Sequence, residues 1–186
     1  MRIVGGRHGG RTLLAPKSQA IRPTADRLRE ALFNILQHSY GDPVAGARVL
    51  DLFAGTGALG LEAHSRGAAF VLFVDDCAEA RALLRGNVDA LGAGGASKVY
   101  RRDATRLGPA HPMEPFSLVF LDPPYGKGLA ERALISAREG GWLTPEALAV
   151  VEEAAGEEFA PPEGFEAIER RDYGDTQLVF LKLNPR

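Results

Sequence analysis

The chain is poor in cysteine and in long apolar runs, and each scarcity excludes a class of protein. Its single cysteine, Cys77, excludes an intramolecular disulfide and a cysteine-rich zinc site. The longest apolar run, residues 68–74, is far shorter than the roughly 20 residues that span a bilayer. The N-terminus lacks the apolar core of a signal peptide, and the four histidines have no ligand spacing. We therefore expect a cytoplasmic protein with no membrane partner and no metal.

The net charge of −2 hides a strong asymmetry. Residues 1–30 hold seven Arg or Lys against two acids, a balance of +5, so the rest of the chain carries −7. A basic arm on an acidic body indicates a polyanionic partner, and the glycines of residues 5–10 leave backbone N–H groups accessible to phosphates. Arg29 could instead pair with groups on the body. The residues expected to bind phosphates are Arg7, Arg11, Arg22, Arg27 and Arg29.

Helical and strand patterns alternate along the 186 residues, which is typical of a single α/β domain with a mostly parallel sheet. Residues 2–14 predict a short hairpin, and residues 23–38 predict a helix with Thr24 as its N-cap. Residues 1–41 are thus an N-terminal hairpin-and-helix extension, and 42–186 the main domain. The last two strands predict an antiparallel hairpin. In the main domain we expect strands over residues 48–52, 70–74, 98–101, 117–121, 147–152, 166–171 and 177–183, and helices over 58–66, 78–91 and 129–139.

The tetrapeptide Asp122-Pro123-Pro124-Tyr125 stands at the end of an apolar run. Two prolines donate no backbone N–H, so the strand stops there with an acid at its carboxyl end, where ligands of open α/β sheets bind. The Asp122 carboxylate and the Pro123 carbonyl can accept both hydrogens of an exocyclic amine, and Tyr125 can stack on an unpaired base. The motif predicts methyl transfer to an amino nitrogen of a nucleobase. The alternative is a strand that happens to end in a proline turn.

The glycine loop Asp51-Leu52-Phe53-Ala54-Gly55-Thr56-Gly57 begins at the end of the predicted strand 48–52. Residues 55–60 also fit the G-x-G-x-x-G dinucleotide fingerprint, and Asp75 lies 20 residues on, so a nicotinamide-dependent dehydrogenase is a competing interpretation. Asp51 separates the two, because a carboxylate aimed into the loop would repel a pyrophosphate. S-Adenosylmethionine has no phosphate and carries a positive sulfonium and amino group. Asp51 therefore favours the methyl donor.

Acids at the ends of the next two strands complete the expected donor site. Asp75 can accept from both ribose hydroxyls, with Asp76 as the second choice, and Asp103 can accept from the adenine amino group, with the Ala104 N–H near the ring. Each acid could instead be a turn or N-cap residue. Glu152 and Glu153 also end a strand nearby and are interpreted as a solvated rim. The expected cofactor-binding residues are Asp51, Phe53, Ala54, Gly55, Thr56, Gly57, Asp75, Asp76, Asp103 and Ala104.

Several blocks of sequence together match a known family. They are residues 2–6 with Gly10-Arg11, 22–30, 51–63, Asn87, 122–125, 148–152 and 173–176. In these blocks the chain resembles the bacterial 16S ribosomal RNA guanine-N2 methyltransferases of the RsmD type. The resemblance implies a Rossmann-like class I methyltransferase fold with a seven-stranded sheet, S-adenosylmethionine as donor, and methylation of the N2 amino group of one guanine in 16S RNA, within a partly or fully assembled small subunit. The family often has another acid where Cys77 stands.

Two further alternatives stay open. The acid-Pro-Pro-aromatic motif serves every planar amino group, so an adenine-N6 or cytosine-N4 methyltransferase fits the motif equally well. A non-catalytic ribosome assembly factor could keep the same fold, although the presence of Asp51, Asp75, Asp122 and Tyr125 argues against it.

Overall fold

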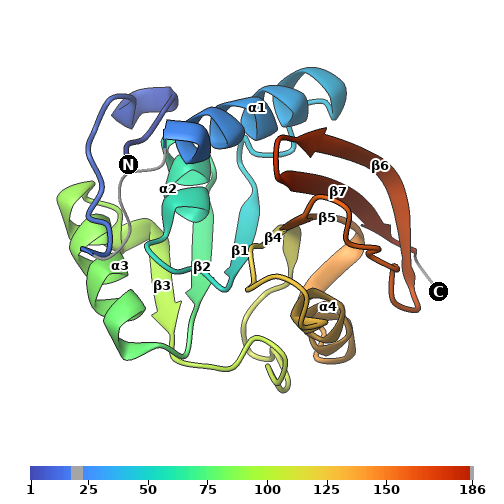
Figure 1. Cartoon of the computed structure of the whole chain (residues 1–186). Helices are drawn as coiled ribbons and strands as arrows, with labels where there is room; N and C mark the ends of the chain where they lie inside the picture. The colour runs from blue at the N-terminus through green and yellow to red at the C-terminus, as the bar shows by residue number, and fades with distance from the viewer. Residues whose placement is uncertain (18–22, 185–186) are drawn as a thin grey trace.

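A computed structural model describes residues 1–17 and 23–184, and its centre is a seven-stranded sheet of order β3-β2-β1-β4-β5-β7-β6 (Figure 1). The first five strands along the chain are parallel to one another, and β7 runs antiparallel to both β5 and β6. The predicted mostly parallel sheet with an antiparallel C-terminal hairpin is therefore confirmed. The strands are β1 (Arg48–Leu52), β2 (Phe70–Val74), β3 (Ser97–Tyr100), β4 (Phe116–Leu121), β5 (Leu143–Ala154), β6 (Phe165–Tyr173) and β7 (Thr176–Leu183).

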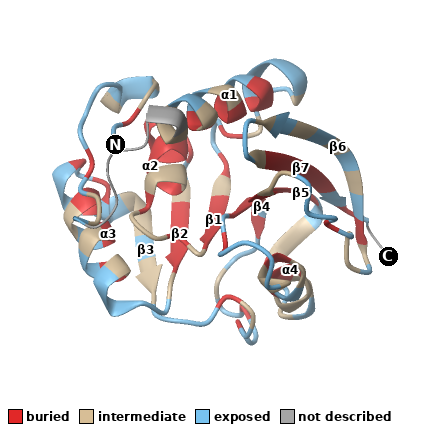
Figure 2. Ribbon diagram, in the orientation of Figure 1, coloured by how far each residue is buried: buried red, intermediate tan, exposed pale blue. Residues whose placement is uncertain are grey.

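Helices cover both faces of the sheet, which explains why the central strands are apolar almost throughout. Side chains of α1 (Pro23–Ser39), α2 (Ala58–Ser65) and α3 (Ala78–Ala90) share one core cluster with Val49, Val71 and Phe120. The helix α4 (Leu129–Glu139) packs on the opposite face. Figure 2 shows the buried residues concentrated in these central strands. Among the described residues, no helix is long and apolar enough to cross a membrane.

The strand β5 begins earlier than predicted. Leu143 pairs with Phe116 and Leu148 with Leu118, so the register shifts between them. The shifted segment contains Pro145 and Glu146, whose φ of 61° is left-handed. A proline argues against a regular strand, yet a bulge tolerates it because the ladder is already interrupted there. All the other predicted elements of the main domain begin and end within two residues of their expected bounds.

The N-terminal hairpin forms only as a single antiparallel bridge between Arg2 and Thr12, around the 3-10 turn η1 (Gly6–His8). Backbone hydrogen bonds from Ile3 N to Arg11 O and from Leu13 N to Met1 O, both 2.9 Å, close it. Ile3 and Leu13 are buried in the same cluster as α1 and β1, so this segment shares the core of the main domain. Arg22 lies outside the described residues, as does the Thr24 side chain with its predicted cap.

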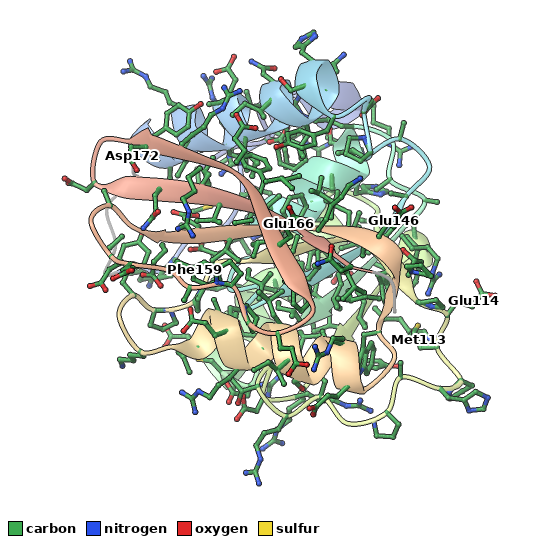
Figure 3. The ribbon with its side chains drawn as sticks, turned by 90° about the vertical axis from the view of Figure 1, so that its right-hand side faces the viewer. Met113, Glu114, Glu146, Phe159, Glu166 and Asp172 are labelled. Carbon is green, nitrogen blue, oxygen red and sulfur yellow. The ribbon has the colours of Figure 1, made fainter. Side chains whose placement is uncertain are left out.

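The two ends of the sheet differ in charge. Residues 146–175, around β6 and its turns, contain ten Asp or Glu and two Arg. Figure 3 shows Glu146, Glu166 and Asp172 on this side of the molecule. The basic arm, here residues 1–17, lies at the other end of the sheet, next to α2 and α3 (Figure 1). There the Arg11 guanidinium donates to the Ala90 carbonyl at 2.6 Å. The sequence asymmetry is therefore also a spatial one.

Candidate active site

The glycine loop leaves the carboxyl end of β1 through a series of left-handed residues. Phe53, Gly55 and Gly57 have φ values of 57°, 58° and 83°. Gly57 favours glycine because L side chains rarely adopt its φ of 83°, and a Cβ there would also lie 2.3 Å from Leu84 Cδ1 of α3. The Gly57 N–H donates to the Ala54 carbonyl at 2.8 Å and closes the turn. The loop is thus a tight, concave turn that leads directly into the start of α2.

Asp51 lies beneath this turn with only 1% of its surface exposed. Its Oδ2 accepts a hydrogen bond from the Gly60 N–H at 3.0 Å, which ties β1 to the first turn of α2. Burial raises the pKa of Asp51 to about 8, the Gly60 hydrogen bond opposes the rise, and the negative charge of Asp75 adds to it. A Cβ at Gly60 would come within 2.9 Å of Asp51 Oδ2 and 2.4 Å of Phe73 Cε1, so this position also requires glycine.

Asp75, at the end of β2, holds the loop from the other side. Its Oδ2 accepts from the Gly55 N–H at 2.8 Å and its Oδ1 from the Cys77 N–H at 2.9 Å. An ionised carboxylate has about four acceptor sites, so both oxygens can accept further hydrogen bonds. Asp76 and Cys77 are exposed beside it. Asp75 therefore both builds the loop and presents acceptors to solvent.

Asp103, after β3, adopts the turn geometry that the sequence left as an alternative. Its Oδ1 accepts from the Thr105 backbone N–H at 2.8 Å and from the Thr105 hydroxyl at 2.7 Å. These two hydrogen bonds hold the pKa of Asp103 below its usual value. The side chain is exposed and ionised, and Ala104 next to it is buried. Asp103 thus remains available as an acceptor.

Two cavities follow the carboxyl edge of the sheet, and both reach the Asp122 motif. Cavity A, of about 480 Å³, is lined by residues after β2 and β3, including Asp75, Asp76, Asp103 and Ala104. Cavity B, of about 500 Å³, lies between the sheet edge and α1 and is lined by Asp51, residues 53–56 and residues 122–125. Phe53, Asp122 and Pro124 line both cavities. The structure therefore brings together every predicted cofactor and catalytic residue except Gly57, which lines neither.

The strand register aligns four side chains across the floor of cavity B. The last ladder pairs, Leu52↔Leu121 and Leu121↔Val151, immediately precede Phe53, Asp122 and Glu152, and Glu152 itself pairs with Leu178 of β7. All four line cavity B. Glu152, interpreted from the sequence as a solvated rim residue, is half-buried, and its side chain forms part of the cavity wall.

The proline turn of the motif is anchored to the end of β5. The Tyr125 hydroxyl lies 3.4 Å from Glu152 Oε1 and 3.3 Å from Thr176 Oγ1. The Gly126 N–H donates to Glu153 Oε1 at 3.3 Å. Glu153 is buried, so its interpretation as a solvated rim residue is wrong. Burial raises the pKa of Tyr125, a hydrogen bond with Thr176 opposes the rise, and the charges of Glu152 and Asp122 add to it.

Arg29 is buried inside an ion-pair network and is not a surface cation. Only 4% of its surface is exposed. Its Nε donates to Glu62 Oε1 at 3.1 Å, and its Nη2 donates to Asp26 Oδ1 at 2.8 Å and to the Arg2 carbonyl. Glu62, fully buried on α2, also accepts from Arg66 and from two backbone N–H groups of the arm. Arg29 therefore pairs with groups on the body of the protein, as the alternative to phosphate binding predicted.

The other described basic residues of the predicted RNA set, Arg7, Arg11 and Arg27, are exposed. The Arg7 guanidinium lies 3.0 Å from His64 Nε2 of α2. Desolvation and the charge of Arg7 lower the pKa of His64, which keeps its ring neutral beside the guanidinium. The arm therefore presents its arginines from a docked position.

Asn87 of α3 connects the arm to the glycine loop. Its Oδ1 accepts from the Leu14 N–H at 2.6 Å, and its Nδ2 donates to the Leu14 carbonyl at 3.2 Å and to the Thr56 carbonyl at 2.9 Å. The side chain is 1% exposed. In the sequence, only the family resemblance had pointed to Asn87. Its contacts couple the arm to the floor of the site.

Comparisons with known proteins agree with this geometry. The model of the family described as Conserved hypothetical protein 95 matches residues 1–182. The chain is 42% identical over 153 residues to ribosomal RNA small subunit methyltransferase D of Escherichia coli strain K12, covering 82% of this chain and 74% of that protein. It is 34% identical over 176 residues to the protein of the same name from Haemophilus influenzae, covering 94% and 89%.

Solved structures share the whole fold. The structure of yhhF from Escherichia coli superposes with a TM-score of 0.84 at 33% identity and covers 100% of this chain and 99% of that chain. The hypothetical protein TTHA0928 of Thermus thermophilus gives a TM-score of 0.74 at 33% identity, with 97% and 98% covered. The chain therefore has the Rossmann-like class I methyltransferase fold and belongs to the Conserved hypothetical protein 95 family, as a homologue of the ribosomal RNA small subunit methyltransferases D.

Proposed function

We propose that this protein transfers a methyl group from S-adenosylmethionine to the N2 amino group of a guanine in 16S ribosomal RNA. The observation that carries the proposal is the position of Asp122, Pro123, Pro124 and Tyr125 where cavities A and B meet. The names of the curated relatives support ribosomal RNA of the small subunit as the substrate class. The acid-Pro-Pro-Tyr motif supports an amino nitrogen as the acceptor.

The chemistry of the cavity walls fits the methyl donor. Asp75, Asp76 and Asp103 supply carboxylate oxygens to cavity A, and the ribose hydroxyls and adenine amine of the donor offer matching N–H and O–H groups. Asp51 lines cavity B; burial raises its pKa, and a positive amino or sulfonium group beside it would favour its ionised form. A pyrophosphate in cavity A would be repelled by the carboxylates of Asp75, Asp76 and Asp103, which disfavours a nicotinamide dinucleotide. When bound, S-adenosylmethionine supplies a methyl group activated by its positive sulfur.

Asp122 and Pro123 prepare the acceptor nitrogen. The Asp122 carboxylate and the Pro123 carbonyl accept the two N–H bonds of the guanine amine, which localises the nitrogen lone pair and stabilises the developing positive charge. Tyr125, 42% exposed, offers a stacking face to a base flipped out of its helix. A nitrogen–carbon bond forms as the donor's sulfur–carbon bond breaks, and one N–H proton leaves, with Asp122 as its acceptor. This chemistry uses positioning and hydrogen bonding by the protein's own groups.

The charge distribution supports an RNA-binding side. Arg7 and Arg11 extend from the docked arm and Arg27 from α1, and Arg22, which lies outside the described residues, adds a fourth cation to the proposed phosphate-binding set. The acidic β6 end of the sheet would repel a polyanion, so the RNA would approach over the arm. The proposed substrate is this RNA within a partly or fully assembled small subunit. The proposed location is the cytoplasm, where such particles occur.

Methyl transfer to unmodified small-subunit RNA tests the proposal. Labelled S-adenosylmethionine, nuclease digestion and mass spectrometry should show N2-methylguanosine in naked RNA or in particles. Asp122→Ala should lower the rate by about 10²- to 10³-fold while the protein stays folded. Asp172→Ala, at the acidic end of the sheet, is the matched control and should keep the wild-type rate. Methyladenine, methylcytosine or no methylated base as the product, or a near-wild-type rate for Asp122→Ala, would contradict the proposal.

Calorimetric titration tests the cofactor separately. We expect S-adenosylhomocysteine to bind and NADH not to bind. Binding of NADH alone would return the glycine loop to the dinucleotide interpretation. Binding of neither, together with RNA binding and no methyl transfer, would favour an assembly factor.

A further inference from the structure

Two carboxylates stand next to each other on the wall of cavity B, and the proposed chemistry uses only one of them. The last register pair of β4 and β5, Leu121↔Val151, immediately precedes Asp122, which follows β4, and Glu152, which lies in β5 two residues before its end. Neighbouring strands lie about 4.8 Å apart, so the two acids are within reach of a single flat base. Both line cavity B, together with Tyr125. The Tyr125 hydroxyl lies 3.4 Å from Glu152 Oε1.

The position of Glu152 is set by rigid structure. Its strand β5 lies between β4 and β7, and Glu152 pairs in the ladder with Leu178, which is 1% exposed. The Tyr125 hydroxyl, 3.3 Å from Thr176 Oγ1, bridges the ends of the motif and of β7. Side chains on regular elements hold a recognition geometry more accurately than side chains on loops. Glu152 therefore has the placement of a residue that reads a ligand.

The bases that carry an exocyclic amine differ in the atom next to it. In guanine the N2 amine adjoins the N1–H, so the edge presents hydrogen-bond donors side by side. In adenine the N6 amine adjoins the unprotonated N1, and in cytosine the N4 amine adjoins the unprotonated N3. An ionised carboxylate only accepts hydrogen bonds. Paired carboxylates therefore match guanine, and the second one would face a lone pair in adenine or cytosine.

We propose that Glu152 selects guanine, by accepting the N1–H while Asp122 and the Pro123 carbonyl hold the N2 amine. This inference rests on the proposed function and deepens it. A single well-placed hydrogen-bonding pair to a base edge discriminates by roughly ten- to a hundredfold, and much of the discrimination arises because the wrong base leaves a polar group unpaired. The same contact fixes the base in its plane, so Glu152 also aligns the amine for transfer.

Replacement of the target guanine by 2-aminopurine tests this inference. 2-Aminopurine keeps the N2 amine, but its N1 is an acceptor. The probe is a small-subunit RNA that the wild-type protein methylates, with the mapped target nucleotide replaced by ligation of a synthetic segment. We expect the wild-type kcat/KM to favour guanine by roughly ten- to a hundredfold. In Glu152→Gln the amide N–H can donate to N1 of 2-aminopurine, so we expect the preference to shrink to within about threefold, with 2-aminopurine gaining activity.

Asp175→Asn is the matched control, because Asp175 is exposed at the neighbouring β6–β7 turn and lines neither cavity. It should keep the wild-type preference. If Glu152→Gln turns over too slowly, the ratio of the Kd values of the two RNAs in the presence of S-adenosylhomocysteine gives the same comparison. An unchanged ratio in Glu152→Gln, or no preference in the wild type, would overturn the inference. Failure of the wild type to methylate any guanine would instead overturn the proposed function, so the two failures are distinguishable.

Discussion

Arg29 and Glu62 form a buried ion pair, with 3.1 Å between Arg29 Nε and Glu62 Oε1, that joins α1 to α2 beneath the N-terminal arm. Their side chains are 5% and 0% exposed. Glu62 also accepts the backbone N–H groups of Val4 and Gly5, each at 2.9 Å. One buried carboxylate therefore fixes the arm, the first helix and the helix after the glycine loop relative to one another.

Removing one partner of this pair should destabilise the protein strongly. Arg29→Ala leaves the Glu62 carboxylate buried with less compensation, and breaking such a pair typically costs about 3–5 kcal/mol, so we expect a loss of that size in the free energy of unfolding. Arg27→Ala, on the exposed side of the same helix, should change it by less than about 0.5 kcal/mol. Urea denaturation followed by circular dichroism measures both. Equal effects of the two substitutions would show that the pair does not stabilise the fold.

The exposed arginines of the arm should act on RNA and not on the donor. Arg7→Glu and Arg11→Glu should weaken RNA binding for all sequences and lower the slope of log K against log salt by about 1 for each lost phosphate contact. The affinity for S-adenosylhomocysteine should stay the same. Lys182→Glu, an exposed charge reversal on β7, is the control. An equal loss of donor affinity would mean that the arm supports the cofactor site and does not contact RNA.

The raised pKa of Asp51 should make the free energy of unfolding fall as the pH rises. Its folded pKa of about 8 lies above its ordinary value of 3.8, so between these values the folded protein binds more protons than the unfolded chain. The free energy of unfolding then decreases with rising pH across this window, by at most about 1.4 kcal/mol per pH unit for one group, and the contribution is constant above it. Asp51→Asn keeps an acceptor for the Gly60 N–H and should remove this contribution. Urea unfolding at pH 5, 6, 7 and 8 measures this. If the free energy of unfolding changed with pH equally in the variant and the wild type, the raised pKa of Asp51 would be contradicted.

Cys77 should report occupancy of cavity A. It is exposed, lines this cavity with Asp75 and Asp76, and is the sole cysteine of the chain, so any thiol label marks one site. S-Adenosylhomocysteine at ten times its Kd should slow alkylation by iodoacetamide about tenfold, because only the free protein reacts. NADH at the same concentration should leave the rate unchanged. Equal rates with and without S-adenosylhomocysteine would place the donor elsewhere.

The sequence by itself determined the α/β class, the order of the main-domain strands and helices, and the two motifs at the ends of β1 and β4. These features depend on local patterns: apolar periodicity, glycines that allow left-handed backbone, and prolines that stop a strand. The early start of β5 was missed because Pro145 sits in a bulge, which a local pattern does not distinguish from a strand boundary. The N-terminal hairpin was reduced to one bridge because its apolar residues, Ile3 and Leu13, pack into the core instead of extending a ladder.

Only the tertiary structure decided which polar side chains face the site and which hold it together. Arg29 meets Glu62 across 33 residues and Leu14 meets Asn87 across 73, and no local pattern encodes such distances. Glu152 resembled any strand-end acid until the register with β4 placed it beside Asp122. The sequence therefore identified the residues whose roles follow from local motifs. Burial and pairing depend on how distant elements pack, so only the tertiary structure assigned Arg29 to the body and Glu152 to the cavity.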